Sequence, residues 1–257
     1  MPERATVTCF CGQTGLTFAN PLPRNHSECL CVDCRQKLEW ACGQAGRPWT
    51  PTISNLWYID DDVVATKGEE HLQEFVLRSS GEETPVVPGT ETEVVSPFVV
   101  ATCCHSVLCV PAIYYNSNYV AVIEQGCRLQ CQPCTPKIRY AVDEWQEAEW
   151  GALPRYEGDG LVLSKHVFQY RRPLDAGGTG TPEEREVSTA PLRLPPPSRN
   201  AAADACGWFQ QYAMSFFDRS PLDGREGESM RELCDRLGKG VQVLELTEGA
   251  TLPKAPL

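Results

Sequence analysis

The sequence predicts a mainly β protein of small antiparallel sheets, stabilised by metal-bound cysteines and followed by a C-terminal extension with two short helices. Three observations predict it. Short β-branched or alternating segments are separated by Gly, Pro, Asn and Asp. All of the 14 cysteines except Cys206 and Cys234 lie at or before Cys134. The composition changes near residue 140, beyond which a Pro- and Gly-rich stretch follows.

The strands expected in the first part are short. Each combines β-branched residues or period-two alternation with turn residues on either side, and helical periodicity between them is weak. They cover residues 5–10, 16–18, 56–59, 72–77, 94–102 and 119–123. Residues 79–93 are acidic and carry Gly and Pro. We expect them to form a surface loop that interrupts a hairpin.

The chain divides into a cysteine-rich β domain, residues 1–140, and an extension, residues 141–257. In the extension, residues 161–170 resemble a strand. Residues 173–199 are rich in Pro, Gly, Thr and charge, so we expect a linker or an arm on the surface.

Two helices and a strand are expected beyond this linker. A helix at 201–217 carries aromatic residues along one face, which predicts packing on the β domain or exposure to a partner protein. A second helix at 228–237 has apolar residues at i, i+3, i+4 and i+7 and a glycine stop. Residues 241–246 are typical of a closing strand.

The charge and hydropathy exclude some classes of partner. The formal net charge is −11 at pH 7, and the longest basic run is Arg171-Arg172. Affinity for a polyanion depends on clustered Lys and Arg. No apolar run approaches the roughly 20 residues of a membrane-spanning helix. We therefore predict a protein that binds neither nucleic acid nor membranes.

The cysteine spacing predicts metal ligands rather than disulfides. The first residues show no charged-then-apolar leader, so we expect a cytoplasmic or other reducing intracellular compartment. In a reducing compartment, C-x-C and C-x-x-C motifs are typical of thiolate ligands of a metal. The groups are the C-x-C pair (Cys9, Cys11), the three-thiol loop (Cys29, Cys31, Cys34) and the adjacent pair (Cys103, Cys104).

The number of thiols in each group predicts two zinc ions. Zinc that only holds a fold has four ligands, whereas catalytic zinc has three and keeps one position open. The three-thiol loop has no further cysteine until Cys42. The C-x-C pair needs distant partners, and the adjacent pair is the obvious source.

In this order the motifs resemble the glutathione-dependent formaldehyde-activating enzyme and centromere protein V family. The resemblance covers roughly residues 5–125. It rests on the C-x-C pair followed by Gly12, the three-thiol loop followed by Arg35, the segment Ala65-Thr-Lys-Gly68-Glu with Leu72 and Phe75, and a late cysteine cluster.

The resemblance implies a β-tent-like fold with a structural and a catalytic zinc. The C-x-C pair with a later C-x-x-C would hold the first, and the three-thiol loop the second. The late motif departs from C-x-x-C, because Ser106 stands where the second cysteine is expected after Cys103. Three candidates for the fourth ligand stay open, in the order Cys104, Cys109 and His105. The alternative is that one of these thiols is simply buried and binds no metal.

An open zinc site predicts chemistry between a thiol and an aldehyde, because a metal deprotonates a bound thiol and polarises a carbonyl. The resemblance implies formation of S-hydroxymethylglutathione from glutathione and formaldehyde, or of a related adduct of a small thiol and a small aldehyde. This is a carbon–sulfur lyase reaction. Its catalytic residues would be Cys29, Cys31, Cys34 and Arg35. Arg35 either binds a glutathione carboxylate or makes an ordinary surface salt bridge.

Two further interpretations stay open. The chain is a catalytically inactive, zinc-stabilised interaction module or subunit of a larger assembly, which binds a protein partner through its extension. Separately, Cys127, Cys131 and Cys134 are either a third zinc site, completed by another cysteine or His166, or reduced thiols near the end of the domain.

Overall fold

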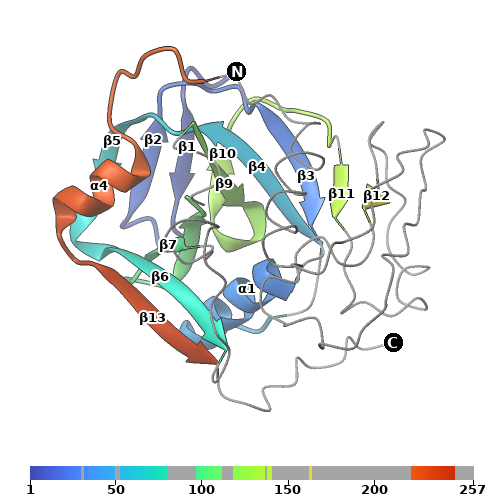
Figure 1. The fold of residues 1–257 in the computed structure, drawn as a ribbon, viewed down its shortest axis with the longest axis vertical. Coiled ribbons are helices and arrows are strands. Elements are labelled where there is room, and N and C mark those ends of the chain that lie inside the picture. The colour runs from blue at the N-terminus through green and yellow to red at the C-terminus, as the bar shows by residue number, and fades with distance from the viewer. Residues whose placement is uncertain are drawn as a thin grey trace, which may run out of the picture.

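The computed structural model describes residues 1–29, 32–49, 53–79, 97–111, 118–136, 138–140, 162–163 and 221–246. These residues form three small sheets and two α-helices (Figure 1). Most of the strand pairs are antiparallel, and three are parallel. The predicted mainly β fold class is confirmed.

The first sheet is antiparallel throughout, in the order β10-β1-β2-β5. Its strands are β1 (Ala5–Thr8), β2 (Gly15–Phe18), β5 (Val63–Lys67) and β10 (Arg128–Gln130). Burial alternates along β1 and β2, so one face of this hairpin lies in the core and the other is partly exposed. The predicted strands at 5–10 and 16–18 correspond to β1 and β2.

The second sheet has the order β12-β11-β3-β4-β9. Its strands are β3 (Asn25–Cys29), β4 (Ser54–Asp60), β9 (Tyr119–Ile123), β11 (Ile138–Tyr140) and β12 (Val162–Leu163). β4 pairs antiparallel with β3 and β9, whereas β11 runs parallel to β3 and β12. The predicted strand at 119–123 is confirmed as β9. Of the predicted strand at 161–170, only β12 lies among the described residues.

The third sheet has the order β13-β6-β7-β8. Its strands are β6 (Leu72–Ser79), β7 (Phe98–Ala101), β8 (Ser106–Cys109) and β13 (Val241–Leu246). β6 and β7 pair antiparallel, as expected for the two arms of a hairpin, and most of the loop predicted between them lies outside the described residues. β13 pairs with β6 in parallel along its whole length, so the predicted closing strand is confirmed.

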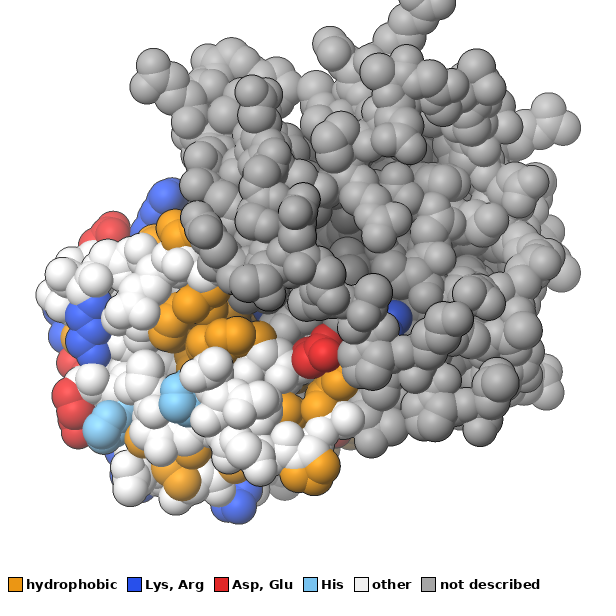
Figure 2. All heavy atoms as spheres, turned by 90° about the horizontal axis from the view of Figure 1, so that it is seen from below, with side chains coloured by type: hydrophobic (Ala, Val, Ile, Leu, Met, Phe, Trp, Pro, Cys, Tyr) orange, Lys and Arg blue, Asp and Glu red, His pale blue; other side chains and the backbone are white. Residues whose placement is uncertain are grey.

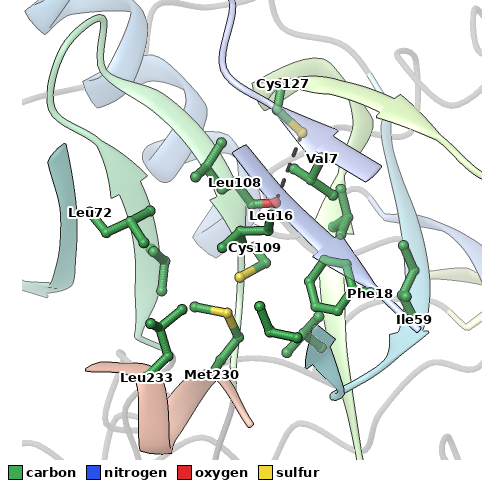
Figure 3. Packing of buried hydrophobic residues seen from close by; sticks show 14 of the residues in the cluster. Val7, Leu16, Phe18, Ile59, Leu72, Leu108, Cys109, Cys127, Met230 and Leu233 are labelled. Atoms are coloured by element: carbon green, nitrogen blue, oxygen red, sulfur yellow. Dashed lines mark hydrogen bonds between the residues drawn. The ribbon is translucent and has the colours of Figure 1, made fainter. Parts of the chain in front are cut away.

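The three sheets share one hydrophobic core with a C-terminal helix (Figure 3). β1 and β2 contribute Val7 and Phe18, β4 contributes Ile59, and the helix contributes Met230 and Leu233. Each of these side chains is fully removed from solvent. Because the extension supplies part of this core, its described residues belong to the same folded unit as the cysteine-rich part. The boundary at residue 140 stays a prediction.

The helix α1 (Val32–Gln44) was not predicted, and the expectation of weak helical structure in the first part was wrong here. Its apolar residues Cys34, Leu38 and Ala41 are buried at helical spacing. Arg35 and Lys37 are also buried, at 5% and 1% exposure. In the sequence, these cations are expected to be exposed to solvent. Because they instead lie among the buried positions, the helix has no clear division into an apolar and a polar face.

The predicted helix at 228–237 is observed as α4 (Met230–Leu237), which begins two residues after the predicted start and ends at the predicted residue. Ser229 and Glu232 form a reciprocal capping box, in which each side chain accepts a hydrogen bond from the other residue's backbone N–H. Gly238 ends the helix in the left-handed conformation. The predicted helix at 201–217 lies outside the described residues.

Three consecutive buried aspartates, Asp60, Asp61 and Asp62, occupy the last position of β4 and the turn that follows it. Asp62 accepts hydrogen bonds from two backbone N–H groups of residues 226 and 227, at 3.0 and 2.7 Å. Asp61 Oδ1 accepts from Met230 N at 2.7 Å, at the first turn of α4. The carboxylates therefore hold the start of the C-terminal helix against the β4–β5 turn.

The surface carries mixed charge where it is described. Figure 2 shows one face, on which hydrophobic side chains gather with charged side chains of both signs scattered around them. Among the described residues, no helix combines the length and apolar character needed to cross a membrane.

Replacing Asp61 by asparagine should remove a pH-dependent cost of this anchoring. Burial raises the pKa of the Asp61 carboxyl to about 7, whereas an unfolded chain has a value of about 4. The folded state therefore binds the proton more tightly, and the free energy of unfolding falls as pH rises through this window, by about 1.4 kcal/mol per pH unit. We expect urea denaturation to show wild type losing about 2 kcal/mol relative to Asp61→Asn between pH 5.5 and 8.

The control is Asp223→Asn, at an exposed position. It should leave the pH profile of the wild type unchanged. Parallel profiles for wild type and Asp61→Asn would contradict the assignment.

Candidate metal centre

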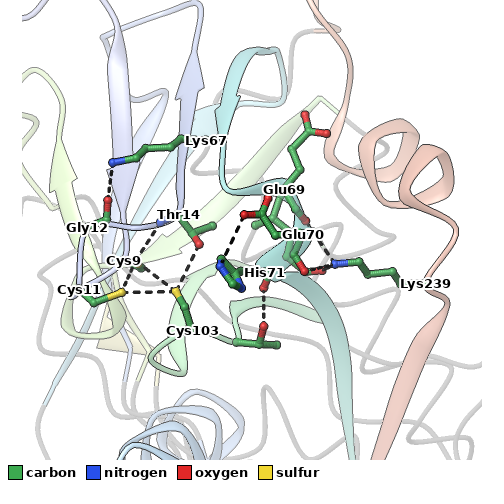
Figure 4. Close-up of polar contacts among 12 residues, drawn as sticks. Cys9, Cys11, Gly12, Thr14, Lys67, Glu69, Glu70, His71, Cys103 and Lys239 are labelled. Carbon is green, nitrogen blue, oxygen red and sulfur yellow. Dashed lines mark hydrogen bonds and ion pairs between the residues drawn. The ribbon is translucent and has the colours of Figure 1, made fainter.

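Four cysteine sulfurs meet between the first and the third sheet. Those of the C-x-C pair and the adjacent pair all lie within 4.8 Å of one another. Cys9 Sγ is 3.3 Å from Cys11 Sγ and 3.8 Å from Cys103 Sγ, and the Cys11–Cys103 separation is 3.4 Å (Figure 4). Zinc–sulfur bonds of about 2.3 Å give a tetrahedron with edges of about 3.8 Å. These four thiols can therefore hold a metal ion after changes of up to about 1 Å in the distances between their sulfurs.

The C-x-C pair is brought together by a tight turn after β1. Gly12 N donates to Cys9 O at 3.0 Å, and Cys9 N donates to Thr14 O at 2.9 Å. Gly12 has a φ of 77°, a conformation that a residue with a Cβ atom rarely adopts. The turn reverses the chain within a few residues, so that both sulfurs lie on one side.

The adjacent pair lies in the turn between β7 and β8. Cys104 N donates to Ala101 O at 3.2 Å, and His105 closes the turn with a φ of 52°. Among the three ligands left open by the sequence, Cys104 is the one that joins the sulfur group. Cys109 is fully buried in the core, and the His105 ring lies edge-on to Trp40.

Hydrogen-bond donors surround the sulfurs. Thr14 N donates to Cys9 Sγ at 3.2 Å, and Thr14 Oγ1 lies 3.3 Å from Cys103 Sγ. Ser106 Oγ accepts from the backbone N–H of Phe10 at 2.9 Å and lies 3.1 Å from a second sulfur, Cys104 Sγ. Its own hydrogen is therefore available to that sulfur. Donors aimed at sulfur are typical of thiolate ligands.

Ser106 is the residue that interrupts the C-x-x-C pattern in the sequence. At this position Ser106 offers no thiol, and its hydroxyl instead makes a hydrogen bond with Cys104 Sγ, two residues earlier. The departure from the pattern thus leaves a complete set of four thiols.

The four thiols cannot all ionise together without a cation. Burial opposes ionisation of Cys104, but hydrogen bonds from the Ser106 hydroxyl and the Cys11 backbone outweigh it and lower its pKa to about 6. Burial raises the pKa of Cys103 to about 12. A bound divalent ion removes this conflict, because it stabilises every ligand as the thiolate.

The connection from β5 to β6 presses against the C-x-C turn. Lys67 Nζ donates to Gly12 O at 2.6 Å. Gly68 has a φ of 64°, and a Cβ atom there would lie 2.5 Å from Gln13 O and 3.1 Å from Thr14 Oγ1. Only glycine allows the backbone at residue 68 to lie this close to the C-x-C turn. The short helix η1 (Glu69–His71) begins directly after Gly68. The His71 carbonyl then accepts two hydrogen bonds from Thr102, which fix the turn of the adjacent pair.

The three-thiol loop connects β3 to α1. Cys29 is the last residue of β3, Cys34 lies in the first turn of α1, and both are buried. Cys31 lies outside the described residues. The group at the C-x-C and adjacent pairs is the one metal-sized cluster that the described ranges contain.

Arg35 is buried at 5% exposure, so the interpretation of an ordinary surface salt bridge was wrong. Glu39 follows one helical turn later. Burial raises the pKa of that carboxyl, and the Arg35 charge partly opposes the shift.

Hydroxyl groups near the three-thiol loop were not identified from the sequence. Cys29 pairs with Ser54 across β3 and β4, and Ser54 Oγ is buried with no hydrogen-bond partner in the described part of the chain. Ser27 Oγ donates to Tyr58 Oη at 3.4 Å. Burial raises the pKa of Tyr58 well above its usual value, and Cys29 and Cys34 raise it further. The alternation along β3, which places Ser27 and Cys29 on one face, was the available signal.

The later cysteines divide into core and surface. Cys127 is buried in the shared core, and its Sγ donates to Ile123 O at 3.6 Å and to Leu108 O at 3.9 Å. A thiol that donates to carbonyls is protonated. Cys131 and Cys134 are partly exposed and join no metal-sized group with other described residues. A third metal at this cluster has no support from the described geometry.

Comparisons with models of protein families, with curated proteins and with solved structures find no match to this chain.

Removal of the Ser106 hydroxyl should weaken metal binding. Ser106→Ala takes a donor from Cys104 Sγ and leaves the Phe10 N–H without its acceptor. Loss of such an outer contact typically costs about 10- to 100-fold in metal affinity. We expect at least a tenfold higher dissociation constant for Zn²⁺, measured by competition with a chromogenic chelator.

Thr6→Ala is the control for this prediction, since its hydroxyl lies on β1 and bonds to Gln130 on the exposed face. It should bind zinc as the wild type does. An unchanged affinity in Ser106→Ala would show that its hydrogen bond does not stabilise the ligand set.

Proposed function

We propose that this chain is a zinc protein in which the four-thiol centre holds the fold and the three-thiol loop catalyses formation and cleavage of a thiol–aldehyde adduct. The observation that carries the structural centre is the group of four sulfurs within 4.8 Å of one another. The resemblance to the formaldehyde-activating family assigns the same residues to a structural zinc. The catalytic loop is supported by the resemblance and by Cys29 and Cys34, which lie at the junction of β3 and α1.

Zinc is the metal favoured by this ligand set. Four thiolates in a tetrahedron select zinc or iron, and zinc with four protein ligands has no open position for a substrate. The centre would link the β1–β2 hairpin to the β7–β8 turn. Metal binding of this kind contributes directly to folding stability. A reducing intracellular compartment is part of the proposal, since it keeps the ligands as thiols.

The three-thiol loop is the proposed catalytic site. Cys34 lies in the first turn of α1, where the positive end of the helix dipole favours a negative charge. Arg35 and Lys37 place two buried cations on the same helix. Such cations fit the carboxylates of glutathione or another acidic thiol.

A zinc ion bound there would supply a thiolate and a polarised aldehyde carbonyl. In the reaction the thiol sulfur attacks the carbonyl carbon and forms the carbon–sulfur bond. The carbonyl oxygen receives the electron pair and takes up the proton that the thiol lost, so thiol and aldehyde give a hydroxymethyl thioether without an oxidant. Ser54 and Tyr58 carry the hydroxyls that would donate hydrogen bonds to this oxygen, and Ser27, whose hydroxyl donates to Tyr58 Oη, would orient the Tyr58 hydroxyl.

A second candidate function is a zinc-stabilised module without turnover that binds a protein partner. The observation that favours it is the burial of Cys29 and Cys34, at 2% and 7% exposure, because a catalytic metal has to be reached by its substrate. The extension would then provide the partner surface.

Metal content and glutathione titration of Cys31→Ser separate the two functions. We expect two zinc ions per wild-type chain and one in Cys31→Ser, because the variant removes one of three ligands from the loop. Calorimetric binding of glutathione and turnover with formaldehyde should be lost together with this ion.

The matched control is Cys42→Ser, since Cys42 is a partly buried thiol on α1 outside both ligand sets. It should keep two zinc ions and bind glutathione. If the wild type bound only one zinc ion and no glutathione, the enzymatic function would be contradicted. The zinc-stabilised interaction module would then be the remaining candidate function.

A further inference from the structure

We propose that Arg47 is the counter-charge of the four-thiol centre and the positioning residue that couples this centre to α1. The inference rests on the proposed structural zinc and adds a residue that no cysteine motif contains. Arg47 follows α1 by three positions, and its N–H donates to Cys42 O at 2.9 Å at the helix end.

The guanidinium of Arg47 reaches both chelating loops. Its central carbon lies 4.4 Å from the ring centroid of Phe10, the residue between the two thiols of the C-x-C pair. One of its terminal nitrogens, Nη2, donates to His105 O at 3.4 Å, directly after the adjacent pair. A single side chain thus holds the two segments that supply all four ligands.

Within the described residues, no carboxylate pairs with the charge of Arg47. The side chain forms no ion pair there, and its Nε is buried without a hydrogen-bond partner among them. A partly buried cation is costly unless negative charge lies nearby. Four thiolates around one Zn²⁺ carry a net charge of −2, which the −11 charge of the chain does nothing to offset. Arg47 supplies the positive charge on one side of the centre, and Lys67, bonded to Gly12 O, supplies it at the C-x-C turn.

The same contacts connect the centre to the three-thiol loop. α1 carries Cys34 in its first turn and is followed by Arg47 beyond its last. Trp40, between them, contacts the His105 ring edge-on at 6.1 Å. The turn of the adjacent pair is therefore contacted at two points, by Trp40 of α1 and by Arg47 just beyond the helix end. Filling the four-thiol site would fix the end of α1, and a rigid helix transmits this constraint to the loop at its start.

The test compares zinc release from the full chain in Arg47→Gln, Arg47→Lys and the control Arg4→Gln. Arg4 is an exposed arginine whose ion pair with Glu226 lies on the surface. Release is followed with a chromogenic chelator after the zinc content has been determined. We expect Arg47→Gln to release the structural zinc at least tenfold faster. Arg47→Lys keeps the charge and should stay within about threefold of the wild type, as should Arg4→Gln.

A second measurement tests the coupling. Hydrogen exchange of the α1 amides is compared between zinc-saturated wild type and zinc-saturated Arg47→Gln. We expect faster exchange over α1 in the variant at full zinc occupancy, which a role in metal retention alone would not produce. Equal protection would overturn the coupling.

The outcomes are distinct from those of the proposed function. If Cys103→Ser loses no zinc, the structural site itself is wrong. If Cys103→Ser loses one zinc but Arg47→Gln releases zinc at the wild-type rate, only the counter-charge role of Arg47 is overturned. Equally fast release from Arg47→Lys and Arg47→Gln overturns this role too.

Should Arg47→Gln not fold, zinc release is compared between wild type and Arg47→Lys at low and high salt. Similar release rates that salt accelerates equally support the counter-charge role. Faster release from Arg47→Lys at every salt concentration overturns it.

Discussion

The close spacing of four cysteine sulfurs is the constraint on which the rest of the structure depends. The sulfurs belong to two turns almost a hundred residues apart in the chain, and each turn needs a left-handed residue, Gly12 or His105, to present its ligands. Thr14 and Ser106 then direct hydrogen atoms at them. These two hydrogen bonds favour ionised sulfur at Cys103 and Cys104, and four thiolates at this density are stable only around a cation.

Much of the fold was predictable because it follows period-two patterns and local stop signals. β9 and β13 have the predicted bounds, and Ser229 and Gly238 delimit α4 by ordinary capping. α1 was missed because Arg35 and Lys37 are buried where a surface helix would expose them. The pairing of β13 with β6 joins segments too distant for any local signal.

The members of the candidate metal site were predictable from the sequence, but their surroundings were not. Spacing alone identified the C-x-C pair and Cys103, whereas the choice among Cys104, Cys109 and His105 depended on the shape of one turn. Cys109 points into a core built from three sheets, which a linear pattern does not reveal. Ser106 and Arg47 act through hydrogen bonds and charge at positions that carry no motif.

The parallel ladder of β13 on β6 also has a consequence for how the protein is made. Gln73 Nε2 donates to Gly240 O, a contact across 167 residues of sequence. Such a contact forms only after a large loop-closure entropy has been overcome, and it waits until residue 240 has been synthesised. During translation, the edge of β6 that β13 later covers is an open strand able to pair with other chains. Nascent chains that end before residue 241 therefore lack the strand that protects this edge, and aggregation competes with folding until it arrives.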